Sequence, residues 1–187
     1  MPALTLFNEQ ILTEIRLALK QVDNDDIDMM IEAIINAKRI FLAGAGRSLL
    51  MLKCFGMRLM HLGFTVYIIG DVTTPAITQG DLLIIASGSG ETGSMVNIAT
   101  KAQRLLVKGI LITTKSHSSI ASLVEHKVII PTSSLSSDNK KNTFSIQPGA
   151  SLFEQCLLIL FDSIILTYIN DQQRDCESIM LLHANLE

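Results

Sequence analysis

Short apolar runs alternate with amphipathic stretches along most of this 187-residue chain. Five of the runs have the length of buried strands, and the stretches between them repeat their apolar residues at helical spacing. The predicted strands cover residues 39–43, 64–69, 82–86, 109–113 and 127–130. This alternation predicts an α/β fold, a three-layer, doubly wound, five-stranded parallel sheet with helices on both faces.

Helices are predicted before, between and after these strands. Two amphipathic helices precede the first strand, and the cap candidates Asp23–Asp25 separate them. Later helices are predicted over about residues 48–62, 92–106, 120–124 and 148–170. We expect one domain with extra terminal helices. Its parts are N-terminal helices over 1–38, an α/β core over 39–170 and a C-terminal helix over 171–187.

The composition is unusually apolar for a soluble single domain, with 48% hydrophobic and 18% charged residues. We do not predict a membrane span, because Asp162 and Ser163 interrupt the longest apolar run, residues 156–169. Apolar helix surface that a single domain does not need predicts burial between subunits. We therefore expect a homo-oligomer.

Charge and cysteine usage restrict the partners and the compartment. The net charge of −3 and the lack of a basic stripe argue against a nucleic-acid surface. Cys54, Cys156 and Cys176 are scattered without metal-type spacing, which predicts free thiols and no metal site. Free thiols, and a first segment without a signal-peptide pattern, favour the cytoplasm.

The segment Ser87–Thr92 carries the strongest chemical signal. It reads Ser-Gly-Ser-Gly-Glu-Thr between a predicted strand and a predicted helix. A strand, a Ser/Gly turn and a helix start place free backbone N–H groups and hydroxyls together, which favours a bound phosphate. The alternative is a plain connection in which Thr92 caps the helix.

A second turn, Gly44–Ser48, also joins a strand end to a helix. The two turns are expected side by side at the switch point of the sheet, where ligands of open α/β folds bind. A nicotinamide dinucleotide site on Gly44–Gly46, with Asp71 as the ribose acid, is the rival interpretation. Leu49 stands where the third small residue of that fingerprint belongs, which disfavours it.

Several stretches together resemble one known family over almost the whole chain. They are residues 44–48, 57–64, 73–77, 87–92, 147–148, 152–155 and 183–187. The chain resembles the sugar isomerase (SIS) domain family, and within it the 6-phospho-3-hexuloisomerases. The resemblance implies a cytoplasmic homotetramer of the ribulose monophosphate pathway that needs no cofactor. Its implied reaction converts D-arabino-hex-3-ulose 6-phosphate to fructose 6-phosphate through an enediol or enediolate.

The resemblance also implies which residues hold the phosphate. The candidate binding set is Gly46, Arg47, Ser48, Ser87, Ser89, Gly90, Glu91 and Thr92. Arg47 binds phosphate or sugar oxygens in this interpretation, and forms a surface ion pair in the alternative one.

Glu154 is the candidate catalytic base. It lies near the start of the last long helix, whose N-terminus is expected to face the site. The alternative is a capping box over Ser151–Glu154, which the expected earlier helix start at Pro148 disfavours. Glu91 is the second candidate base, with a dipole-pairing role as its alternative.

His61 is the candidate acid or proton shuttle. Counting along the helix from Ser48 places it about 20 Å from its own phosphate turn, so it is expected to serve a neighbouring subunit's site. The alternative is a histidine that simply favours a helix C-terminus. Two other functions stay open: a different phosphosugar isomerase, or a non-catalytic phosphosugar sensor. Such sensors usually carry a DNA-binding domain, and the residues before the first strand lack a recognisable helix-turn-helix.

Overall fold

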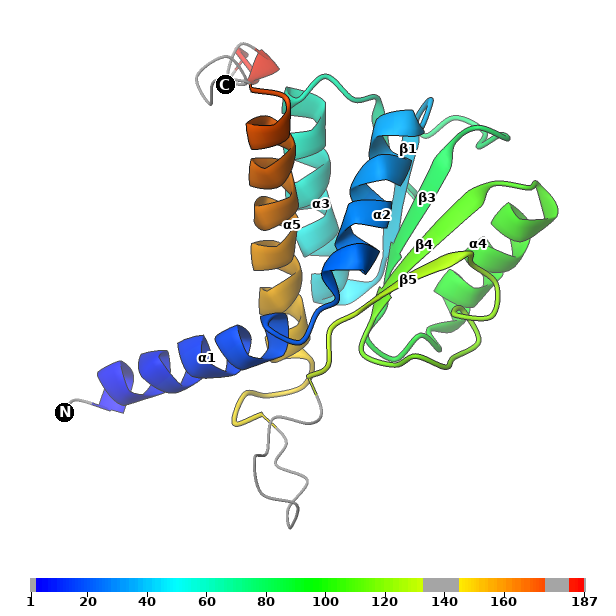
Figure 1. The fold of residues 1–187 in the computed structure, drawn as a ribbon. Helices are drawn as coiled ribbons and strands as arrows, with labels where there is room; N and C mark the ends of the chain where they lie inside the picture. The colour runs from blue at the N-terminus through cyan, green and yellow to red at the C-terminus, as the bar shows by residue number, and fades with distance from the viewer. Residues whose placement is uncertain (1–2, 133–144, 174–181, 187) are drawn as a thin grey trace.

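A five-stranded parallel sheet forms the centre of the protein in a computed structural model, which describes residues 3–132, 145–173 and 182–186. The strand order is β2-β1-β3-β4-β5, and every pair is parallel. The strands are β1 (Ile40–Gly44), β2 (Val66–Ile68), β3 (Leu82–Ala86), β4 (Lys108–Thr113) and β5 (His126–Ile129). The predicted fold class is confirmed (Figure 1).

Helices cover both faces of the sheet. They are α1 (Ala3–Leu19), α2 (Asn24–Asn36), α3 (Gly46–His61), α4 (Gly93–Arg104) and α5 (Ser151–Asp171). Alternate strand residues feed two cores, since Ile40 and Leu42 pack toward α2, α3 and α5 while Phe41 and Ala43 pack toward α4. The helix α1 contacts α5 near its own C-terminal end and projects away from the body (Figure 1).

Helix α5 is the most apolar element. By length and composition alone it is the one described helix that qualifies as a membrane span, but 56% of that stretch is buried inside the molecule. Asp162 does not remove it from this class, contrary to the sequence argument. Phe161 of α5 is buried and stacks on Phe55 of α3, with ring centroids 4.2 Å apart. We therefore treat α5 as a core helix.

Three predicted boundaries were wrong. Strand β2 has three residues instead of six, because it is an edge strand that pairs only with β1 and is half-buried. Residues 120–124 form turns instead of a short helix. A turn bond runs from Leu123 N–H to Ile120 C=O, and the apolar run is too short to extend it into a helix. Helix α5 begins at Ser151, three residues after Pro148.

The C-terminal tail is described only in part. Residues 184–186 are not helical, and the larger part of the predicted helix 171–187 beyond α5 lies outside the described residues.

Candidate active site at the switch point

The two candidate turns leave neighbouring strands at the same edge of the sheet. Strands β1 and β3 pair in register, with Gly44 opposite Ala86. The chain continues from Gly44 into α3 and from Ala86 through Ser87–Thr92 into α4. The order β2-β1-β3 makes this the point where the chain crosses to the other side of β1. This is where open α/β sheets place their ligands.

The turn Ser87–Thr92 is held by its own polar groups. The buried Ser87 hydroxyl lies 3.1 Å from the Thr92 hydroxyl, and Glu91 N–H donates to Ser89 Oγ at 3.1 Å. Gly90 has φ +67°, and a Cβ there would meet Ser118 Oγ at 2.1 Å. Only glycine therefore fits this position without displacing the neighbouring segment.

Neither helix that starts at this edge is capped by a side chain. Thr92 occupies the N-cap position of α4, but its hydroxyl contacts Ser87 and makes no cap hydrogen bond. Ala45 occupies the N-cap position of α3, and its methyl side chain cannot make a capping hydrogen bond. The alternative in which Thr92 merely caps the helix is therefore not realised. The first amide groups of both helices remain available for an anion.

Arg47 and Glu154 form an ion pair across α3 and α5. Arg47 Nε donates to Glu154 Oε2, with the arginine side chain 61% exposed and the glutamate 10% exposed. Arg47 therefore forms an ion pair, as in the alternative interpretation, but its partner is a buried carboxylate and not one at the surface. The structure brings together two residues that lie 107 positions apart.

Glu154 is not part of a capping box. The helix does start later than expected, but its N-cap is Ala150, and the Ser151 hydroxyl donates to the Pro148 carbonyl at 2.7 Å. Glu154 lies in the first turn of α5, with its backbone N–H bonded to Ala150 C=O. Its carboxylate is therefore available for the ion pair with Arg47.

A pocket of about 250 Å³ lies beside the Ser87–Thr92 turn and the start of α5. Its lining includes Gly88, Ser89, Thr114, Thr132, Ser145, Gln147, Gly149, Ala150, Leu152 and Phe153. Phe153 packs under the turn, because a Cβ on Gly88 would lie 3.3 Å from its ring. Sequence reasoning missed Thr114 and Thr132. Their position just after the fourth and fifth strands, at the same sheet edge, was a signal that could have found them.

Glu91 is not among the residues that line this pocket, and its carboxylate is bonded to Ser119. Its carboxylate accepts hydrogen bonds from the Ser119 backbone N–H at 2.8 Å and from the Ser119 hydroxyl. These two bonds lower the pKa of Glu91, despite a small opposing effect of burial. This arrangement favours an anchoring role for Glu91, tying the turn to residues 118–119, over a role as base.

His61 lies at the opposite end of α3 from Ser48. It is 3% exposed, its ring stacks on His183 at 5.2 Å, and its Nδ1 has no hydrogen-bond partner among the described residues. Burial, together with the charges of His183 and Arg58, lowers the pKa of His61. The structure does not bring His61 to Glu154 within one chain, as the count along the helix predicted.

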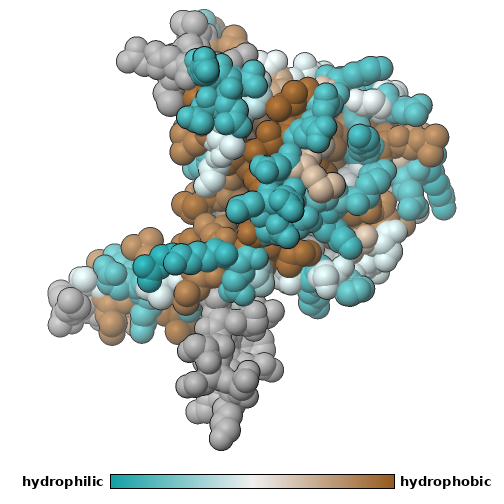
Figure 2. Space-filling view, in the orientation of Figure 1, coloured by the Kyte–Doolittle hydropathy of each residue, from teal (hydrophilic) through white to brown (hydrophobic). Residues whose placement is uncertain are grey.

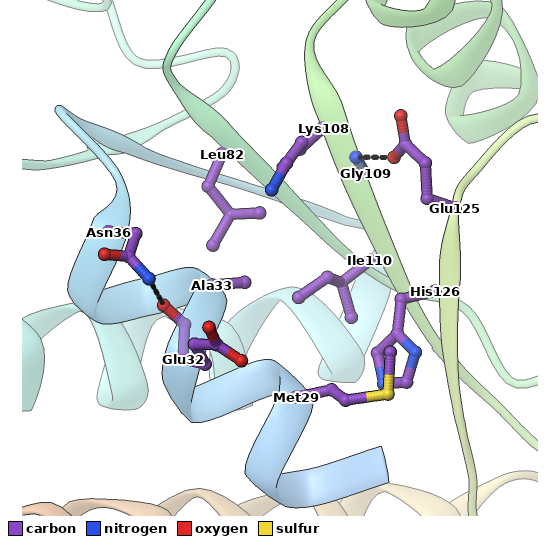
Figure 3. Close-up of a pocket in the computed structure, with 10 residues that line it drawn as sticks. All are labelled: Met29, Glu32, Ala33, Asn36, Leu82, Lys108, Gly109, Ile110, Glu125 and His126. Atoms are coloured by element: carbon purple, nitrogen blue, oxygen red, sulfur yellow. Dashed lines mark hydrogen bonds between the residues drawn. The ribbon is translucent and has the colours of Figure 1, made fainter.

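A second pocket, of about 230 Å³, lies at the amino ends of the strands (Figure 3). It is lined by α2 and by the starts of β3, β4 and β5, and Met29, Lys108 and His126 are among its residues. Two hydrogen bonds join residues of this lining, from Gly109 N–H to the Glu125 carboxylate at 2.6 Å and from Asn36 Nδ2 to the Glu32 carbonyl at 2.9 Å. None of the predicted site residues lies there.

Metal and thiol chemistry receive no support from the described part of the chain. No group of three His, Cys, Asp or Glu side chains there is placed to hold a metal ion. Cys54 is exposed and free, and burial raises the pKa of Cys156 to about 12. That thiol stays protonated at neutral pH. Cys176 lies outside the described residues.

The fold and its switch-point site match one family. The SIS domain model matches residues 33–159, and the chain belongs to this family. The chain is 40% identical to 3-hexulose-6-phosphate isomerase of Bacillus subtilis (strain 168) over 183 residues, covering 98% of each protein. It is 38% identical to 3-hexulose-6-phosphate isomerase of Mycobacterium gastri, covering 89% of this chain and 83% of that protein.

A solved structure agrees with these relatives. The hypothetical protein of Methanococcus jannaschii, whose structure infers a molecular function of 3-hexulose-6-phosphate isomerase, superposes with a TM-score of 0.82. The two chains are 31% identical, and the match covers 96% of this chain and 98% of that one. The sequence-based family assignment is confirmed.

Proposed function

We propose that the protein is a phosphosugar isomerase that interconverts D-arabino-hex-3-ulose 6-phosphate and fructose 6-phosphate. The observation that carries this proposal is the buried Glu154 in the first turn of α5, ion-paired with Arg47 in the first turn of α3, where the Gly44–Ser48 turn begins that helix. The relatives named 3-hexulose-6-phosphate isomerase support isomerisation of the first of these sugar phosphates. The reaction moves a carbonyl from C3 to C2 and needs no redox or metal cofactor.

The phosphate binds between the starts of α3 and α4 in this proposal. Gly46, Ser48, Ser87, Ser89, Gly90 and Thr92 supply hydroxyls and backbone N–H groups. Both helix starts are uncapped, so their dipoles and amides stabilise the dianion. The sugar chain then extends toward the Arg47–Glu154 pair at the starts of α3 and α5.

Glu154 acts as the base. Its carboxylate takes the proton from C2 of the hexulose, the electrons form an enediolate between C2 and C3, and the same proton is returned to C3. Arg47 holds the carboxylate through Nε, and its exposed side chain offers its remaining donors to substrate oxygens. Glu91 holds the turn against Ser119.

A neighbouring subunit completes the site. His61 is too far along α3 to serve its own chain, and its lowered pKa keeps it neutral. In this proposal the His183 ring that covers His61 moves aside, and His61 then exchanges protons between the two oxygens of the neighbour's substrate. Apolar side chains on the projecting α1 suit a subunit contact, with Leu4 72% and Phe7 53% exposed (Figure 2). We propose a cytoplasmic homo-oligomer, a tetramer by analogy with the family.

The test of the base is Glu154→Gln. Removing the proton acceptor while keeping its shape is expected to lower kcat by about 10²- to 10⁴-fold, while calorimetry still detects fructose 6-phosphate binding. The control is Asp162→Asn, the same charge change at an exposed position of α5. Turnover by Glu154→Gln at the level of this control would refute the proposed mechanism.

Mixed oligomers test the shared site. Glu154→Gln and His61→Gln chains are each expected to be inactive alone. Co-expressed, they form interfaces at which one chain supplies Glu154 and the other supplies His61, so part of the activity returns. Mixed oligomers without any regained activity would contradict a site shared between subunits.

A further inference from the structure

One carboxylate of α1 reaches the segment that enters α5. Glu14 Oε1 accepts from Ile146 N–H at 2.9 Å, and Glu14 Oε2 accepts from Gln147 Nε2 at 3.0 Å and from the Ser145 hydroxyl. Ser145 Oγ in turn accepts from Gln147 N–H at 3.0 Å. These contacts join residues more than 130 positions apart and fold the segment 145–147 around a single side chain.

These hydrogen bonds favour the ionised form of the Glu14 carboxylate. Burial raises the pKa of Glu14, but the hydrogen bonds from Gln147, Ser145 and Ile146 outweigh it and lower the pKa below its usual value. An ionised carboxylate with three neutral donors makes charge-assisted bonds that are stronger than bonds between neutral groups.

The segment that Glu14 holds belongs to the candidate active site. Ser145 and Gln147 line the same pocket as Ser89 and Phe153. Directly after it, Pro148 C=O accepts from Ser151 at the start of α5, and Glu154 follows one turn later. The position of the pocket wall therefore depends on a helix that has no residue of its own in the pocket lining.

We propose that Glu14 is a positioning residue for substrate binding. It fixes Ser145 and Gln147 against the hydroxyl-bearing part of the sugar phosphate, on the side of the pocket away from the phosphate turn. This inference rests on the proposed function of the same site. It makes α1 part of the binding site, in addition to the packing of this helix on α5.

Glu14→Gln is the test, with Glu9→Gln as its matched control. Glu9 lies on the same helix, is exposed and undergoes the same change of charge. The substituted amide would present an N–H₂ group to donors, so at least one hydrogen bond is lost. We expect a rise in KM for fructose 6-phosphate of about fivefold to tenfold, the value of one such bond, with kcat per folded chain unchanged.

Gln147→Ala removes the other partner of the Glu14–Gln147 hydrogen bond. If Glu14 acts through Gln147, the double variant raises KM no more than the larger single effect. A purely structural role for Glu14 would lower the folded fraction and kcat while KM stayed at the Glu9→Gln value, and that outcome overturns the inference. Wild-type protein that neither binds nor converts fructose 6-phosphate would overturn the proposed function itself, which separates the two failures.

Discussion

Gly90→Ala is the change that most sharply probes the phosphate turn. Gly90 has φ +67°, a conformation that costs an alanine about 1–2 kcal/mol. The new Cβ would lie 2.1 Å from Ser118 Oγ, which must move and release its hydrogen bond from Ala121 N–H, worth about 1 kcal/mol. We therefore expect the free energy of unfolding to fall by about 2–3 kcal/mol.

The same change should weaken phosphate binding. Movement of the turn takes at least one backbone N–H away from the dianion, and a hydrogen bond to a charged group is worth about 1.5–3 kcal/mol. Calorimetry should thus show affinity for fructose 6-phosphate lowered by about tenfold or more. Urea denaturation of the same samples measures the loss of stability.

Gly93→Ala is the matched control three residues later. Gly93 starts α4, has no positive φ, and a Cβ there meets nothing within 4 Å. We expect it to leave binding intact and to be neutral or slightly stabilising. Adding Ser118→Gly to Gly90→Ala removes the steric overlap and should recover part of the loss. If Gly90→Ala matched Gly93→Ala in both stability and affinity, the geometry assigned to the turn would be wrong.

Two further predictions concern buried titratable groups. Asp81 is buried, and although burial opposes it, hydrogen bonds from Arg39 and Thr78 lower its pKa. Asp81→Asn should cost about 2–3 kcal/mol by urea denaturation at pH 7. That cost should shrink as the pH falls below about 4. The ionised carboxylate stabilises the folded state at a pH above its unfolded pKa, and this stabilisation is lost as the carboxylate is protonated. A cost that does not change with pH would contradict the lowered pKa of Asp81. His61 has a lowered pKa, so its neutral form favours the folded state above about pH 6.5, and stability should fall as the pH drops below that value. His61→Phe should flatten this dependence between about pH 5 and 7, and an unchanged curve would refute the assignment.

The sequence was sufficient for the parts of the site that depend on local pattern. The apolar run before Ser87 and the glycines after it predicted a strand, a turn and a helix, and β3 and α4 confirm this order. The pairing of β1 with β3 also confirms that the two candidate turns leave adjacent strands. Parallel topology makes such a juxtaposition follow from strand order alone.

Contacts between distant segments could not be predicted from the sequence. The Arg47–Glu154 ion pair depends on how α3 packs on α5, and nothing in either segment specifies that packing angle. In the sequence, Glu14 is one of the polar positions of the first amphipathic helix, and nothing in that pattern predicts its contacts with residues 145–147. The start of α5 was misplaced because Pro148 fits both a first helical turn and the turn before it.

A crystal structure of the protein with fructose 6-phosphate would test the central claim most directly. We predict the phosphate between the starts of α3 and α4, on the Ser87–Thr92 turn, with the Glu154 carboxylate within reach of the protons on C2 and C3 of the sugar. A phosphate bound elsewhere, for example in the pocket at the amino ends of the strands in Figure 3, would contradict it.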